Sequence, residues 1–209
     1  MNALSELARE RSKDGIFSRA EVACWIGGSE DRQYSMLKRS VSAGEIVKLR
    51  RGLYCLASRY LPQPLHPFEL AQRIYGPSYI SMESALSVHQ LIPEAVYTVT
   101  NVSLNRSCHV STPFGNFSFS RIPQKEFYVD ISRVGEGSHY FLASPLKALT
   151  DLVYIRSYNG SPLPLLNSLR IEQSFLKECD LSAIDRLNDN YRAVCVREFL
   201  NGLKKEIHR

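Results

Sequence analysis

Cationic side chains that could contact phosphate groups gather between positions 32 and 51. This stretch of twenty residues contains one acid, Glu45, against six basic residues, so its formal charge is +5. Arginine and lysine bind phosphate oxygens, and arginine also pairs with the edge of guanine, so the pattern indicates contact with nucleic acid. The basic residues are Arg32, Lys38, Arg39, Lys48, Arg50 and Arg51.

Helix start and stop signals predict the elements that must position these cations. A first helix covers about residues 4–11 and ends before Gly15. Ser18 and Glu21 form a capping box that opens a second helix, which Gly27-Gly28 terminates. Ser29 can cap a third helix that runs to about residue 43. Two helices joined by a short glycine-containing turn form a helix-turn-helix pattern.

The third predicted helix has two different faces. At 100° per residue one face is apolar and is expected to pack inward, with Tyr34, Leu37 and Val41. We also expect Trp25 and Tyr34 to belong to the core of this small domain. The opposite face is mostly polar and cationic, as in a helix that reads the DNA major groove, and holds Arg32, Ser35, Met36 and Arg39.

Two short β-prone runs, 46–49 and 53–56, surround the turn Arg50-Arg51-Gly52 and predict a hairpin wing beside the third helix. The sequence therefore predicts a winged helix-turn-helix DNA-binding domain over residues 1–60, which carry +4 of the chain's net charge of +5. A protein-binding module of the same shape is the alternative. The expected DNA-binding residues are Arg32, Gln33, Ser35, Lys38, Arg39, Lys48, Arg50 and Arg51.

The sequence predicts a second domain, of the α+β class, over residues 67–209, after a linker that contains Pro62 and Pro64. We expect a small antiparallel sheet from strands at 97–103, 108–112, 116–122, 127–131 and 140–142. Expected helices cover 67–76, 82–89, 169–177 and 191–205, with a further one opened by Ser144-Pro145. Leu146, Leu149 and Val153 lie on one face of that helix.

Catalytic and metal-binding patterns are weak in this sequence. No Glu-x-Lys occurs, and Gly135-x-Gly137 lacks the third glycine of a dinucleotide loop. Ser144-x-x-Lys147 has the spacing of a serine nucleophile with a lysine base, but helix capping by Ser144 is favoured. Cys108 and His109 are neighbours in a predicted strand, so their side chains point to opposite faces. We expect no catalytic residue, no metal site and no cofactor, and we expect that the protein is not an enzyme.

Cysteine spacing and hydropathy give the expected compartment. The five cysteines are widely spaced without any Cys-x-x-Cys pair, so they predict neither a disulfide framework nor a zinc site. No run of 18 apolar residues occurs, and charges within the first fifteen residues exclude a signal-peptide core. We therefore expect a cytoplasmic protein without a membrane partner.

Three segments in this order resemble the AbiEi-family antitoxins of bacterial type IV toxin–antitoxin systems, over about residues 3–155. The first, at 47–54, reads VKLRRGLY, the second, at 79–91, reads YISMESALSVHQL, and the third, at 144–152, reads SPLKALTDL. Arg50, Arg51 and Gly52 match the wing turn of the family. Gln90 departs from the family pattern, which often has glycine at this position.

The resemblance implies a DNA-binding antitoxin and transcriptional autorepressor. Such a protein binds inverted repeats in double-stranded promoter DNA. It also counteracts a nucleotidyltransferase-like toxin, in general without a stable complex between the two. An alternative from another class is a nucleic-acid-processing enzyme that uses the winged helix for targeting.

Overall fold

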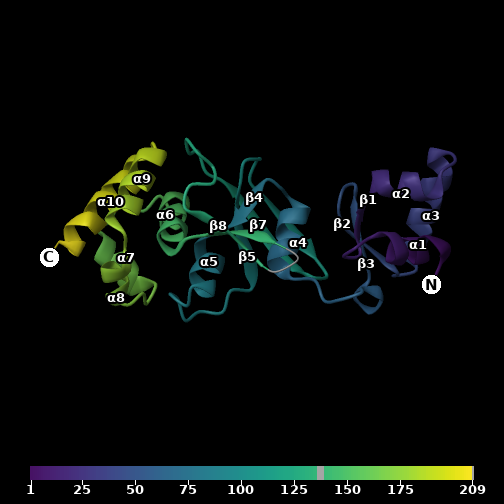
Figure 1. The fold of residues 1–209 in the computed structure, drawn as a ribbon, viewed down its shortest axis with the longest axis horizontal. Helices are drawn as coiled ribbons and strands as arrows, with labels where there is room; N and C mark the ends of the chain where they lie inside the picture. The colour runs from purple at the N-terminus through teal and green to yellow at the C-terminus, as the bar shows by residue number, and fades with distance from the viewer. Residues whose placement is uncertain (136–138, 209) are drawn as a thin grey trace. The chain divides into compact units, whose positions relative to one another are not determined.

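The computed structural model describes residues 1–135 and 139–208, and it is a mixed α+β chain (Figure 1). The chain divides into two compact units. The first comprises Met1–Leu70 with Val110–Gly115, and the second comprises Ala71–His109 with Asn116–Arg209. The division between them falls inside helix α4 (Pro67–Ile74). Gly137, part of the rejected Gly135-x-Gly137 pattern, lies outside the described residues.

Three helices and a three-stranded sheet build most of the first unit. The helices are α1 (Ala3–Arg11), α2 (Arg19–Ile26) and α3 (Glu30–Ser42), and each lies close to its predicted position. Strands β2 (Ile46–Arg50) and β3 (Leu53–Leu56) form the predicted hairpin. A short strand that the sequence did not predict, β1 (Ile16–Ser18), pairs with the other side of β3, and a 3-10 turn covers Ser58–Tyr60.

Local capping explains where the helices of the first unit begin. The Ser18 hydroxyl accepts from the Glu21 amide at 3.2 Å, and the Glu21 carboxylate accepts from the Ser18 amide at 2.7 Å. This confirms the predicted capping box, which satisfies two amides that would otherwise lack a helical partner. Ser29 caps α3 as predicted, through a 3.4 Å hydrogen bond from the Arg32 amide.

The core of the first unit corrects two sequence-based assignments. Trp25 packs against the buried cluster as expected, 5.4 Å from the ring of Phe17. Tyr34, predicted to be buried, is 58% exposed, whereas Met36, predicted to face outward, packs against the core. Met36, Leu37 and Val41 pack against the core cluster, so the buried face of α3 is centred away from Tyr34. The buried Ser40 lies on the same face, and its hydroxyl donates to Asn2 at 3.0 Å.

We expect Tyr34→Ala and Leu37→Ala to differ strongly in their effect on stability. Leu37 is 5% exposed within the core, so its truncation should lower the free energy of unfolding by about 2–5 kcal/mol. Truncation of the exposed Tyr34 should change it by less than about 0.5 kcal/mol. Urea denaturation of both variants measures the two effects. A cost for Tyr34→Ala as large as that for Leu37→Ala would contradict this orientation of α3.

A second sheet, most of which belongs to the second unit, has six strands among the described residues, in the order β6-β7-β5-β4-β9-β8. It is mixed, because β5 runs parallel to β7 and β4 runs parallel to β9. The prediction of a small antiparallel sheet is therefore wrong. The strands are β4 (Ser78–Ile80), β5 (Thr98–Ser103), β6 (Cys108–Thr112), β7 (Gly115–Arg121), β8 (Ile131–Val134) and β9 (Tyr140–Ala143).

Two features of this sheet could not be read from hydrophobic periodicity. Strand β4 is only three residues long, and it inserts between β5 and β9. The predicted strand at 127–131 is wrong, because residues 127–130 form a turn and β8 begins at Ile131. The aromatic rings at that turn pack on neighbours instead of alternating across a sheet: Phe127 lies 4.9 Å from Tyr79, and Tyr128 lies 5.1 Å from Phe141.

Helices α5 (Met82–Val88) and α6 (Pro145–Ile155) pack against each other beside the sheet, and the C-terminal helices gather beyond α6 (Figure 1). The helix predicted at 169–177 is helical only over 174–177, because Arg170 adopts a φ of +55° that no right-handed helix contains. No described helix is long and apolar enough to cross a membrane. The C-terminal helices are α7 (Pro162–Ser168), α8 (Ser174–Glu178), α9 (Leu181–Asn190) and α10 (Val194–Ile207).

Candidate nucleic-acid interface

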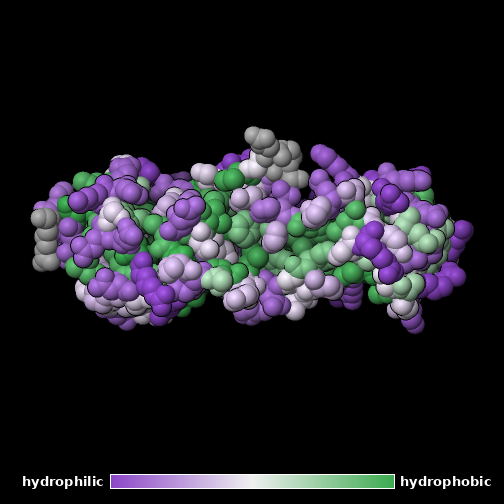
Figure 2. Space-filling view, turned by 90° about the horizontal axis from the view of Figure 1, so that it is seen from below, coloured by the Kyte–Doolittle hydropathy of each residue, from purple (hydrophilic) through white to green (hydrophobic). Residues whose placement is uncertain are grey.

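Helix α3 presents a polar and cationic outer face. Ser35, Lys38 and Arg39 are exposed, and the exposed Tyr34 lies one turn before Lys38 on this face. The Arg39 Nε donates to the carbonyl of Ser35 at 3.3 Å, which leaves its two terminal nitrogens for another partner. In the view of Figure 2 most of the visible surface of the first unit is hydrophilic, with smaller hydrophobic areas between. The outer face of α3 can therefore offer donors and an aromatic ring to a groove of DNA.

Arg32 and Gln33 lie in the first turn of α3, next to the turn that joins it to α2. The amide of Gln33 donates to the carbonyls of Gly27 and Gly28, at 3.4 and 3.2 Å. Gly28 has a φ of +73°, and a Cβ placed on it would lie 3.5 Å from Cδ of Arg32. Arg32 is exposed and free to turn outward, whereas Gln33 is half-buried and already hydrogen-bonded. Gln33 therefore acts in this structure as a brace for the turn.

The hairpin carries the second group of cations. Lys48, Arg50 and Arg51 are exposed, while Leu49 between them is buried at 3% exposure. Lys48 and Arg50 flank the buried Leu49 and both face outward, as the alternation of side chains along a strand predicts. The register of β2 against β3 shifts between these two cations. The carbonyl of Gly52 accepts from the Arg19 amide at 3.0 Å, so the hairpin turn is tied to the start of α2.

The acids near these cations have partners of their own. Glu45, the one acid between positions 32 and 51, accepts from the Asn2 amide at 2.8 Å and lies 3.6 Å from the N-terminal amine. The hydrogen bond from Asn2 lowers the pKa of this carboxyl, so it stays ionised beside the amino terminus. Glu30 and Asp31 occupy the first turn of α3, where a negatively charged carboxylate interacts favourably with the positive end of the helix dipole. The cationic surface is therefore concentrated at the later turns of α3 and on the hairpin.

A buried ionic cluster in the second unit was missed by sequence reasoning. Lys147 and Asp151, one turn apart on α6, are both 0% exposed, and Lys147 Nζ lies 3.2 Å from Asp151 Oδ1. Asp151 Oδ2 accepts from the hydroxyls of Ser81 and Tyr79, at 2.7 and 3.1 Å. The Tyr191 hydroxyl contacts both members of the pair. The only signal in the sequence was a charged pair at i, i+4 on an otherwise apolar helix.

Burial controls the ionisation of this cluster. It lowers the pKa of the Lys147 ammonium, and the nearby Asp151 carboxylate opposes that shift. Burial also raises the pKa of the Tyr79 and Tyr191 hydroxyls well above the usual value, and the charge of Asp151 adds to the increase. Both phenols therefore remain protonated donors. Neither charge of the pair is exposed to solvent. The hydrogen bonds of the cluster hold α6 to the sheet and to the end of α9.

The residues considered for nucleophilic chemistry serve other purposes in the structure. Ser144 caps α6 through a 3.2 Å hydrogen bond from the Lys147 amide, as predicted. Its hydroxyl is committed to this cap, and Lys147 Nζ is bound to Asp151 and Gln124 instead. Burial raises the pKa of the Cys108 thiol, which disfavours its thiolate. Within residues 1–135 and 139–208, no three His, Cys, Asp or Glu side chains form a group that could hold a metal ion.

No protein-family model matches the chain, and a search of curated proteins found no match. The similarity to AbiEi-family antitoxins therefore rests on the three sequence segments themselves. In the structure the second and third segments meet, because Tyr79 and Ser81 from one bind Asp151 from the other. The two segments thus contribute to one buried junction.

Proposed function

We propose that the first unit is a winged helix-turn-helix that binds double-stranded promoter DNA, and that the chain is an autorepressing antitoxin. Helix α3 would enter the major groove, and the β2–β3 hairpin would contact phosphates as the wing. Its operator would consist of inverted repeats. Its functional partner would be a nucleotidyltransferase-like toxin that it counteracts without a stable complex.

One observation carries the DNA-binding part of this proposal. The six cations predicted from the sequence are all exposed, and they lie on two neighbouring elements of one small unit, α3 and the β2–β3 hairpin. The single acid between positions 32 and 51 is occupied by the amino terminus. A surface with exposed cations and few competing carboxylates attracts the phosphate backbone and releases its counterions. The antitoxin part is supported by the resemblance described above.

The test uses the full chain and the DNA upstream of its own gene. We expect retention of this promoter fragment in a mobility-shift assay, with at least tenfold preference over scrambled DNA, as specific binding normally exceeds non-specific binding by about 10³-fold or more. Co-expression should also rescue growth from a nucleotidyltransferase-like toxin encoded beside the gene. Equal affinity for promoter and scrambled DNA would contradict the repressor assignment. Failure to rescue growth would contradict the antitoxin assignment separately.

A further inference from the structure

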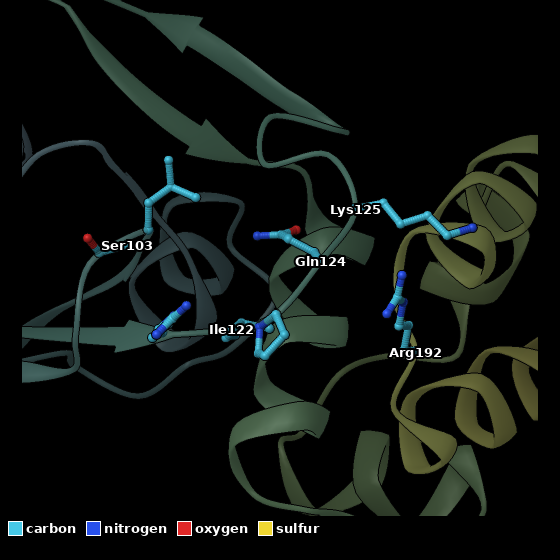
Figure 3. A pocket seen from close by; sticks show the side chains of 8 residues that line it. Ser103, Ile122, Gln124, Lys125 and Arg192 are labelled. Atoms are coloured by element: carbon cyan, nitrogen blue, oxygen red, sulfur yellow. The ribbon is translucent and has the colours of Figure 1, made fainter.

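A cleft of about 480 Å³ opens on the second unit, beside the end of β7. This volume lies within the range of about 300–1,000 Å³ that small-molecule sites occupy. Three cations line it: Arg121 at the end of β7, Lys125 in the following loop, and Arg192 between α9 and α10. Figure 3 shows Lys125 and Arg192 coming from two different segments, with Gln124 between them and Ser103.

The cations of this cleft lack acidic partners. None of the three forms an ion pair with a carboxylate of the described residues, and no acid is among the lining side chains. Other arginines of the same unit are paired, as Arg156 is with Glu83 at 3.0 Å. Three unpaired cations around one concave surface raise the local positive potential and favour an anion with several charges.

Two of the cations are held in place by the buried cluster. Lys125 follows Gln124, whose amide oxygen accepts from Lys147 at 2.6 Å and whose amide nitrogen donates to Tyr79 at 3.0 Å. Arg192 follows Tyr191, which is 2% exposed and contacts the same ion pair. In both places a residue bonded to the cluster, the half-buried Gln124 or the buried Tyr191, fixes the backbone from which the next side chain reaches outward. The backbone positions of Lys125 and Arg192 are therefore set before a ligand binds, which reduces the entropic cost of binding.

The remaining wall of the cleft is apolar. Leu104, Ile122 and Pro123 line it, and Leu104 is 53% exposed. Ser103 lies opposite Arg121 in the pairing of β5 with β7. Its buried hydroxyl already donates to the carbonyl of Pro77 at 3.0 Å, so the guanidinium of Arg121 is the polar group available at this edge. An apolar surface next to clustered cations matches a ligand with a flat heterocycle and a charged tail.

We propose that this cleft binds a small nucleotide. Its phosphates would lie on Arg121, Lys125 and Arg192, and its base would pack against the apolar wall. The inference is independent of DNA binding by the first unit, since every lining residue belongs to the second.

The test is isothermal titration of the full chain with the four ribonucleoside triphosphates and with inorganic tripolyphosphate. We expect one site that binds at least one of the four nucleotides. Arg121→Ala and Arg192→Ala should each weaken this binding about tenfold or more, because a charge-assisted hydrogen bond is lost. Arg197→Ala is the matched control, since Arg197 is exposed on α10 outside the cleft. Leu104→Asn should weaken nucleotide binding but leave tripolyphosphate binding unchanged.

Several results would overturn the proposal. The first is that none of the four nucleotides binds, and the second is that the arginine variants bind as the parent does while their circular dichroism is unchanged. Tripolyphosphate that binds as tightly as every nucleotide would identify a simple polyanion site. Tighter binding of a single-stranded oligonucleotide, weakened by the same arginine variants, would identify a nucleic-acid surface instead. Promoter binding should be unchanged in Arg121→Ala and Arg192→Ala, which separates this outcome from failure of the proposed repressor function.

Discussion

Asp151→Ala is expected to lower the free energy of unfolding by about 3–5 kcal/mol, because it leaves the Lys147 ammonium buried without its counter-ion. Both side chains of this pair are 0% exposed, so water cannot replace the lost carboxylate. The hydroxyls of Tyr79 and Ser81 would lose their acceptor as well. Urea denaturation at neutral pH measures the effect, with Asp185→Ala, at an exposed ion pair with Lys204, as the matched control.

The companion variant Lys147→Met should cost less than Asp151→Ala. The carboxylate of Asp151 would keep its hydroxyl donors from Tyr79, Ser81 and Tyr191, and methionine would fill the space of the lysine stem. The double variant Asp151→Leu/Lys147→Met should cost less than the sum of the two single changes, because no buried charge remains. A decrease of less than about 1 kcal/mol in the free energy of unfolding of Asp151→Ala would contradict this prediction, because the Lys147 ammonium would then be stabilised without its carboxylate partner.

The pH dependence of Asp151→Ala gives a second readout. Burial already lowers the pKa of Lys147, and removal of the opposing carboxylate should lower it further. A folded state with a lowered lysine pKa binds fewer protons than the unfolded state, so its stability rises with pH. The deficit of the variant should therefore shrink as pH increases from neutral toward about 10, the ordinary range of lysine. The parent protein should show a weaker dependence over this interval.

The sequence allowed much of the first unit to be predicted, because its signals are local. Ser18 with Glu21, Ser29, and the glycines at 27 and 28 act within one helical turn, and they define where α2 and α3 start and stop. The orientation of α3 was not predictable in the same way. Its buried face includes the polar Ser40, which donates to Asn2, 38 positions away, and leaves out the aromatic Tyr34, so hydrophobic periodicity alone places this face wrongly.

The second unit was less predictable because its decisive contacts are long-range. Strand β4 has three residues, and it becomes a strand only through partners on β5 and β9. Lys147 and Asp151 have the i, i+4 spacing of an ordinary surface pair. In the structure, however, the hydroxyl of Tyr79 binds Asp151 and the hydroxyl of Tyr191 contacts Lys147. The cleft could not be predicted either, because Arg192 is distant in the sequence from Arg121 and Lys125 and lines one cleft with them only in the folded unit.

The wing and the recognition helix should contribute differently to DNA binding. Arg50→Ala with Arg51→Ala should weaken binding to promoter and scrambled DNA alike, because hairpin cations are placed to contact phosphates. The salt slope of log K should fall by about 0.9 for each phosphate contact removed. Arg39→Ala or Arg32→Ala should instead erase much of the promoter preference, since an arginine paired with guanine contributes about 1–3 kcal/mol of discrimination.

Gln33 and Arg9 sharpen this comparison. Gln33→Ala should leave promoter preference nearly unchanged, because its amide is already bound to Gly27 and Gly28 carbonyls. Arg9→Ala removes an exposed cation of α1 outside the proposed interface, so it is the control for charge. Salt titration of each variant on promoter and scrambled DNA separates the two roles. If the wing variant loses promoter preference while the Arg32 and Arg39 variants keep it, the wing reads the sequence, through the width of the minor groove.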